Sequence, residues 1–389
     1  MQRAFCLSLC LLFAAAPPLA FSQNPRTAED FYNRGLQKQG QQDLEGALAD
    51  FEQALARKPD PEVLGALYLS RANLLMAKGD LNAALLDMNR ALALDPRNFQ
   101  VLYNRGVLRL EMGQFDEAIA DFDATLAIQT NFSMAYNNRG NARKAKGDTE
   151  GAIADYDNAI RHFPQGALGY FNRAAARQSK NELEKSLADY TQAIALAPDL
   201  FEAYLNRGIV WQLTGKLDAA IADFNRAVEL KADDADIYVS RGNALQAKGE
   251  PDKAIADFTK ALELNPQHAD AYTNRGIARK NKKDAPGALA DFDRAIAANS
   301  GDAVAYVNRG TLREERGDRK GALADFDMAL AINPALAQAY ANRGVIRIQQ
   351  GHIEQGEQDL SRAIALDATL KPSLEKYQAD MKRYRGKKP

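Results

Sequence analysis

The sequence predicts an all-α protein, an α-solenoid of ten helix-turn-helix repeats of 34 residues each, followed by a C-terminal capping helix. Three observations predict this fold. The tripeptide Asn-Arg-Gly occurs seven times at a fixed spacing, apolar residues recur at helical intervals between its copies, and a break follows each first helix. A fixed period of this length is typical of stacked supersecondary units rather than of separate globular domains.

The small residue that follows each repeated arginine defines the period. Every step between these residues is 34, apart from the first step of 37 from Gly35 to Ala72. The series continues at Gly106, Gly140, Ala174, Gly208, Gly242, Gly276, Gly310 and Gly344. We therefore expect ten repeats over 28–370, preceded by a short lead at 23–27 and followed by a capping helix and basic tail at 371–389. Positions within a repeat are numbered 1 to 34, with this small residue at position 8.

Each repeat predicts two helices. In 201–234, Tyr204, Gly208 and Trp211 lie on one helical face at positions 4, 8 and 11, and Gly215 at position 15 ends the first helix. Alanine at 20, an aromatic residue at 24 and alanine at 27 then form the apolar stripe of the second helix. Small residues at 8 and 20 allow close approach of the two helices, with the aromatic residue packed beside them.

The pattern of a large residue at 4, a small one at 8, alanine at 20, an aromatic at 24, alanine at 27 and proline near 32 resembles the tetratricopeptide repeat family, here with NRG-type repeats. The resemblance implies a right-handed superhelix whose concave inner surface is lined by the first helix of each repeat. It also implies binding of protein partners, although one scaffold of this kind serves many partners.

Arginine occupies position 7 of all ten repeats, where the family usually has leucine, and aspartate occupies position 23 of all ten. The two positions lie about equally far from the turn, so antiparallel helices bring them level. We expect an Arg–Asp pair in each repeat, extended in six repeats by a second arginine at position 11. An arginine row for anionic ligands is the alternative.

Asparagine at position 6 forms what we call the asparagine ladder. Its eight members are Asn33, Asn104, Asn138, Asn172, Asn206, Asn274, Asn308 and Asn342. Asparagine is a mediocre helix former, and an amide matches both groups of a peptide backbone. Position 6 lies roughly opposite the core of the helix pair, and the resemblance places the first helices on the concave surface, so it implies that the ladder runs along the groove. We expect it to bind an extended polypeptide there, with Asn141, Tyr103 and Phe171 on the same wall. The alternative is that these asparagines are hydrated or bonded to a neighbouring repeat.

The sequence lacks the motifs that would indicate catalysis, metal binding or nucleic-acid binding. The three histidines fall at unrelated positions, and no phosphate loop or nucleophile elbow occurs, so we expect no metal, no cofactor, no small-molecule substrate and no catalytic residue. A net charge of −1 excludes a global nucleic-acid footprint. Members of the family that hold a chaperone's C-terminal carboxylate use basic residues at 2, 5 and 6, and this chain has none there.

The N-terminus predicts export. A basic start, the apolar run 4–16 and small residues near Ser22 match a secretory signal peptide at 1–22, and both cysteines lie inside it. We therefore expect an exported, cysteine-free scaffold or adaptor that binds an extended polypeptide, in the periplasm or secreted. Membrane contact is expected at most through the basic tail. A self-associating structural component, or a non-catalytic subunit of an envelope or transport complex, is the alternative.

Overall fold

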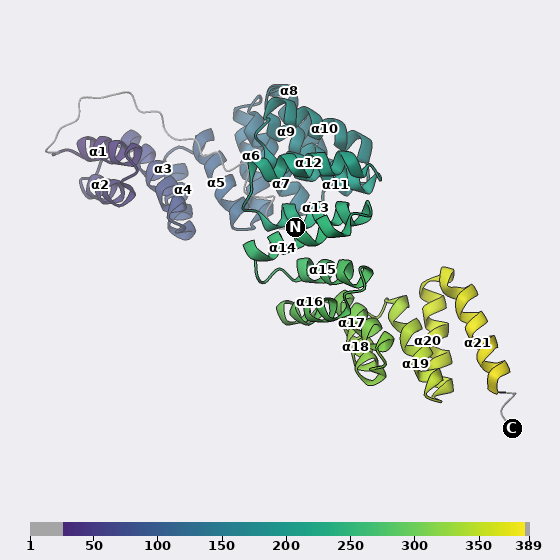
Figure 1. Cartoon of the computed structure of the whole chain (residues 1–389). Coiled ribbons are helices and arrows are strands. Elements are labelled where there is room, and N and C mark those ends of the chain that lie inside the picture. Colours follow the sequence, from purple (N-terminus) through teal and green to yellow (C-terminus); the bar gives the residue numbers. More distant parts are fainter. Residues whose placement is uncertain (1–25, 386–389) are drawn as a thin grey trace. The chain divides into compact units, whose positions relative to one another are not determined.

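The computed structural model describes the backbone of residues 26–385 and the side chains up to residue 381, and every element among them is helical (Figure 1). The signal peptide expected at 1–22 and the last residues of the basic tail lie outside the described residues. The first helices of the repeats are α1 (Ala28–Gly40), α3 (Pro61–Ala77), α5 (Phe99–Glu111), α7 (Ser133–Ala145), α9 (Ala167–Ser179), α11 (Phe201–Leu213), α13 (Ala235–Ala247), α15 (Ala269–Asn281), α17 (Ala303–Glu315) and α19 (Ala337–Gln349).

The second helices alternate with the first along the chain. They are α2 (Leu44–Ala56), α4 (Leu81–Leu94), α6 (Phe115–Ile128), α8 (Thr149–His162), α10 (Leu183–Leu196), α12 (Leu217–Leu230), α14 (Pro251–Leu264), α16 (Ala285–Ala298), α18 (Arg319–Ile332) and α20 (Ile353–Leu366). A 3₁₀ turn, η2 (Ala368–Leu370), and a last helix, α21 (Lys371–Arg385), follow.

The chain divides into two compact units, Met1–Ala203 and Tyr204–Pro389. Within each unit the two helices of a repeat pack against each other, and each second helix contacts the first helix of the next repeat, as α6 contacts α7 and α14 contacts α15. First helices of adjacent repeats also contact each other, as α7 contacts α9 and α15 contacts α17. This is the all-α repeat solenoid that the sequence predicts.

The turn between the helices of a repeat requires a left-handed residue at position 15. Glycine provides it in seven repeats, for example Gly147 at φ +85°. In the remaining three repeats the same conformation is adopted by Gln42, Asn181 and Lys283, with φ of +61° to +65°. Residues other than glycine rarely adopt this backbone conformation. The fold therefore requires the left-handed turn at position 15 even where no glycine is present.

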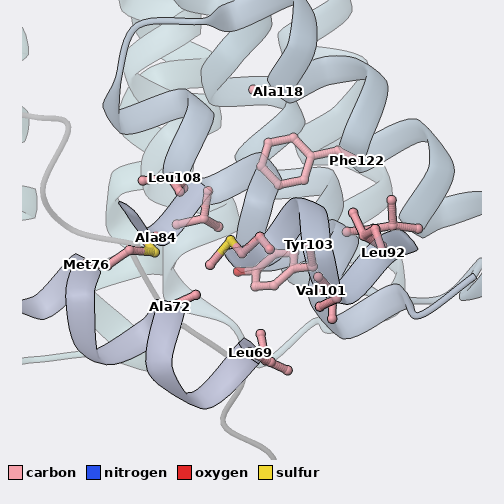
Figure 2. Close-up of a cluster of buried hydrophobic side chains, with 14 of the residues drawn as sticks. Leu69, Ala72, Met76, Ala84, Leu92, Val101, Tyr103, Leu108, Ala118 and Phe122 are labelled. Carbon is pink, nitrogen blue, oxygen red and sulfur yellow. The ribbon is translucent and has the colours of Figure 1, made fainter. Parts of the chain in front are cut away.

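The small residues at position 8 allow the close approach that the sequence predicts. A Cβ atom on Gly106 would lie 2.7 Å from Cε1 of Phe122, the aromatic residue at position 24 of the same repeat. Phe122 is fully buried, as are Tyr103 and Ala118 around it, in a core cluster that spans the second and third repeats (Figure 2). Even the Cβ atom of an alanine at Gly106 would therefore require the ring of Phe122 to shift.

The three additional residues near the start of the second repeat lengthen its first helix. α3 has 17 residues and begins at Pro61, in the first turn where proline is tolerated, whereas the neighbouring α5 has 13. The insertion is therefore absorbed as a helical turn and leaves the period of the following repeats unchanged.

The last helix covers the end of the tenth repeat. Leu374 of α21 is 8% exposed, and Tyr377 and Met381 pack with it against Ile348 and Leu360 of the tenth repeat. The hydroxyl of Tyr377 also lies 3.5 Å from the carbonyl oxygen of Val345. α21 thus takes the place that the first helix of a further repeat would occupy, and its apolar stripe keeps the repeat end out of water.

Candidate functional site

The Arg–Asp pair predicted in each repeat is present in all ten. The guanidinium at position 7 donates from Nη2 to the carboxylate at position 23 over 2.5–2.8 Å, and from Nε to the same carboxylate. The aspartates are only 1–7% exposed. In six repeats the arginine at position 11 also donates to this carboxylate, over 2.6–2.9 Å. The structural interpretation of the two uniform positions is confirmed.

The first repeat shows the electrostatic balance at this carboxylate. Burial alone would raise the pKa of Asp50, but hydrogen bonds from Arg34 and Lys38 outweigh it, so the pKa of Asp50 lies below its usual value of 3.8. The carboxylate therefore stays ionised although it is buried, because two cations share it.

A second contact of the same arginine joins adjacent repeats. Nη1 of Arg139 donates to Asp123 over 2.5 Å, and Nη1 of Arg309 donates to Asp293 over 2.7 Å; both acceptors stand at position 25 of the preceding repeat. Five further repeats form the same contact within 3.0 Å, to Asn89, Asp157, Asn225, Thr259 and Asp327. The sequence analysis missed this contact, although position 25 is polar in every repeat and carried the signal.

The planar face of the arginine is also covered. In seven repeats the guanidinium carbon lies 5.3–5.8 Å from the ring centre of the tyrosine at position 4 of the same repeat. With its donors used within and between repeats and its face on an aromatic ring, this arginine holds the solenoid together and offers little to an outside anion.

Part of the asparagine ladder lies between repeats rather than on an open surface. We call the surface formed by positions 2, 5, 6, 9, 12 and 13 of the first helices the first-helix face. On it Asn104 is 0% and Asn138 is 3% exposed. The amide of Asn104 donates to Asn73 over 3.0 Å, and that of Asn138 donates to the hydroxyl of Tyr103 over 2.9 Å. Position 6 faces the preceding first helix, so the expectation that these two asparagines are open is wrong.

Two more members donate to the preceding repeat. Asn172 donates to Asn137 over 2.9 Å, and Asn342 donates to the hydroxyl of Thr311 over 3.1 Å. Asn308 instead donates to the carbonyl of Val304 in its own helix over 2.9 Å. Asn172 and Asn342 therefore match the alternative of a bond to a neighbouring repeat, whereas Asn308 bonds along its own helix.

Two of the three wall residues expected beside the ladder are also placed differently. Tyr103 is 0% and Phe171 is 1% exposed, because position 5 packs against the aromatic residue at position 24, here Phe122 and Tyr190. These two residues belong to the core and do not line an open wall. Asn141 is half-buried, and its Oδ1 accepts the hydroxyl proton of Tyr156 over 2.8 Å.

The three remaining ladder members have side-chain amides that are still available to a partner. Asn33, Asn206 and Asn274 are half-buried, and within residues 26–385 their side chains form no hydrogen bond. Their amides are therefore the members of the ladder with both a donor and an acceptor left for a partner.

The part of the chain that the structure describes offers no metal site and no membrane span. No group of three or more histidine, aspartate or glutamate side chains comes close enough to hold a metal ion there. Between residues 26 and 385, no helix has the length and apolar character needed to cross a bilayer.

With this geometry the chain is an all-α solenoid of helical hairpins, and sequence comparison names its family. Models described as tetratricopeptide repeat or TPR repeat match residues 69–131, 135–164, 176–215, 212–249, 235–268, 258–290 and 337–370. The chain belongs to the tetratricopeptide repeat family. The fold of this family is a scaffold for protein–protein interactions, and proteins that have it are typically non-catalytic.

Solved structures share the fold. A tetratricopeptide repeat protein from Parabacteroides merdae is 21% identical, with a TM-score of 0.53 over 64% of this chain and 98% of its own. The Cut9–Hcn1 hetero-tetramer of the APC/C matches with 14% identity and a TM-score of 0.52, over 88% of this chain and 73% of its own. YrrB, described as having an unusual peptide-binding site, is 28% identical with a TM-score of 0.40, over 47% of this chain and 95% of its own. No curated protein sequence matches the chain significantly.

Proposed function

We propose that this protein is an exported scaffold whose first-helix face binds an extended segment of a polypeptide partner. Membership of a family of protein-binding scaffolds supports the general role. The signal-peptide pattern at 1–22 supports export to the periplasm or beyond.

The observation that carries the proposal is the division of the asparagine ladder. Four members donate to the preceding repeat, whereas Asn33, Asn206 and Asn274 lie on the same helical face without a hydrogen bond among the described residues. A mid-helix asparagine is less favourable than alanine by up to roughly 0.7 kcal/mol, so an unbonded one gains nothing for the fold. An extended main chain supplies the carbonyl and N–H groups that these amides lack.

The test is a double variant in the second unit, Asn206→Ala with Asn274→Ala, against a matched control. Each amide contact contributes about 0.5–1.5 kcal/mol, so we expect roughly 5- to 150-fold weaker binding to an array of unstructured peptides. Far-ultraviolet circular dichroism should be unchanged. The control is Asn158→Ala, a half-buried asparagine on the second helix α8 whose amide donates to the carbonyl of Ala154 in its own helix.

Equal loss of binding in the control and in the double variant would remove the support for a ladder. Unchanged binding in the double variant would show that peptides bind elsewhere. Export is tested separately, by expressing the full chain and sequencing the N-terminus of the protein released from the periplasm. We expect that terminus at Gln23, and a chain that retains residues 1–22 would contradict export.

A further inference from the structure

Two buried tyrosines in the first unit set the orientation of two amides on the first-helix face. Position 24 is tyrosine only in the fourth and fifth repeats, as Tyr156 and Tyr190, and it is phenylalanine, methionine or leucine in the other eight. The hydroxyl of Tyr156 lies 2.8 Å from Oδ1 of Asn141, and that of Tyr190 lies 3.1 Å from Oε1 of Gln178. Burial, aided by the neighbouring aspartates, raises the pKa of both tyrosines, so each hydroxyl keeps the proton that it donates.

These two hydrogen bonds leave the amide nitrogens as the outward groups. Because each amide oxygen accepts a tyrosine proton, the NH₂ groups of Asn141 and Gln178 face away from the core. Neither NH₂ group has a hydrogen-bond partner among the side chains and backbone that the structure describes up to residue 381. The fold therefore presents two oriented donors at this place, and no oriented acceptor.

A lysine lies on the same part of the first-helix face as these two amides. Lys144 follows Asn141 by three residues in α7, so both side chains lie on one face of the helix. Gln178 has the equivalent position, 12, in α9, and the bond from Asn172 to Asn137 over 2.9 Å holds α7 and α9 side by side. By this helical spacing Asn141, Lys144 and Gln178 lie on neighbouring turns of the first-helix face, and we call these three residues the donor cluster.

Lys144 has no counter-charge. It is half-buried, burial lowers its pKa, and it forms no ion pair with any described residue, including Glu111 at the end of α5. The second unit shows what an equivalent lysine does. Lys280, also at position 12, lies 3.5 Å from Glu315 at position 13 of the next repeat. The residue that corresponds to Glu315 beside Lys144 is Ser179, whose hydroxyl bonds to its own helix.

We propose that the donor cluster binds a carboxylate group of the polypeptide partner. A half-buried ammonium without a counter-charge is unfavourable, and two oriented NH₂ groups beside it add donors but no acceptor. A carboxylate accepts about four hydrogen bonds and supplies the missing charge. The inference rests on the proposed function, because it names one group that the bound segment must carry. Its residues occupy positions 9 and 12, not the positions 2, 5 and 6 that hold a chaperone's C-terminal carboxylate in other members of the family.

The experiment measures the reactivity of Lys144 in the full chain. Each lysine amine is labelled with trace acetic anhydride and quantified by mass spectrometry, at increasing concentrations of three small probes. N-acetylaspartate amide carries a side-chain carboxylate, N-acetylalanine carries a C-terminal carboxylate, and N-acetylasparagine amide carries neither. We expect one or both carboxylates to protect Lys144 saturably, and the uncharged probe to leave it reactive. Lys280 is the internal control, because Glu315 already pairs with it.

Two variants test the cause of the protection. Ser179→Glu restores the acidic residue that pairs with Lys280 in the second unit, so Lys144 should become as unreactive as Lys280 without any probe. In the double variant Tyr156→Phe with Tyr190→Phe the amides are free to turn, and protection by the carboxylate probe should need a roughly tenfold higher concentration, as for the loss of one charge-assisted hydrogen bond.

The outcomes separate this inference from the proposed function. Equal responses of Lys144 and Lys280 to the carboxylate probes would overturn it, and so would equal protection by the uncharged probe. Unchanged protection in the tyrosine variant would remove the two amides from the site. Loss of peptide binding with Lys144 protection intact would overturn only the proposed function, since the small probes need no extended partner.

Discussion

The two carboxylates that share Arg139 allow a sharp test of what holds consecutive repeats together. Asp155 lies in the same repeat, is 1% exposed, and accepts from Arg139 over 2.5 Å and from Arg143 over 2.8 Å. Asp123 belongs to the preceding repeat, and its side chain is 52% exposed. Replacing either by asparagine removes one charge and few atoms, so the two variants differ mainly in burial.

The magnitudes follow from that difference. Removing one partner of a buried ion pair costs about 3–5 kcal/mol, because the remaining charge is left without compensation. The side chains of Arg139 and Arg143 remain 14% and 27% exposed, and the new amide keeps one acceptor oxygen. We therefore expect Asp155→Asn to lower the free energy of unfolding by about 2–3 kcal/mol. Asp123→Asn removes an exposed pair and should cost about 0–1 kcal/mol.

Hydrogen–deuterium exchange is the suitable assay, because a solenoid unfolds locally and one global free energy is not guaranteed. At 1.36 kcal/mol per factor of ten, amides of α7 and α8 should exchange roughly 30- to 150-fold faster in Asp155→Asn. Urea titration followed by circular dichroism gives the same comparison for the whole chain. Equal effects of the two substitutions would refute the reasoning, because burial would then not decide the contribution of the pair.

Three further changes test the charges of single repeats. The hydrogen bond of His268 to Asp236 raises the pKa of His268 above 6.5. The stabilisation that this bond provides is therefore present below pH 6.5 and is lost as the pH rises through the folded pKa. Thermal melts of His268→Gln should lack this fall of the melting temperature with pH. The lowered pKa of Asp50 acts in the opposite direction: its stabilisation is present above pH 3.8 and is lost as the pH falls through the folded pKa, and Asp50→Asn should lose less stability than the parent over that range in thermal melts. Leu245 stands where six repeats have the second arginine and lines a hollow of about 370 Å³ beside Asp257. Leu245→Arg should therefore raise the urea midpoint, followed by the fluorescence of the single tryptophan, and a lower midpoint would contradict the role of position 11.

Much of the fold could be predicted because a tandem repeat presents the same physical constraint ten times. Arginine at 7 and aspartate at 23 are uniform, and their equal distance from the turn is enough to place them together. The small residue at 8 and the aromatic at 24 are likewise explained within one helix pair, as the 2.7 Å approach of Gly106 to Phe122 shows. These constraints act inside a single repeat and could be derived from helical geometry, whereas the packing of position 5 against position 24 of the same repeat was missed.

Most of what could not be predicted lies between repeats. A helical wheel places position 6 away from its own partner helix, but it carries no information about the first helix of the preceding repeat. That helix provides the acceptor for Asn138 in Tyr103 and the acceptor for Asn172 in Asn137. The bond from Arg139 to Asp123 was missed for the same reason.

Asparagine at position 6 therefore has two different roles in different repeats, and the side chains of the preceding repeat decide which role it has. The amide of Asn138 donates to the hydroxyl of Tyr103, which stands at position 5 of the preceding repeat. At the same position before Asn274 stands Val239, and the amide of Asn274 forms no hydrogen bond within the described chain. Where the preceding side chain accepts, position 6 fixes the stacking of two repeats. Asn342 follows the apolar Val307 and still finds an acceptor, the Thr311 hydroxyl at position 9 of the preceding repeat, so the amide is left for a partner only where neither position accepts it, as at Asn274. The ladder is consequently not one continuous binding surface, and a bound polypeptide should be held at separate places along the first-helix face, set by what the neighbouring repeat leaves unpaired.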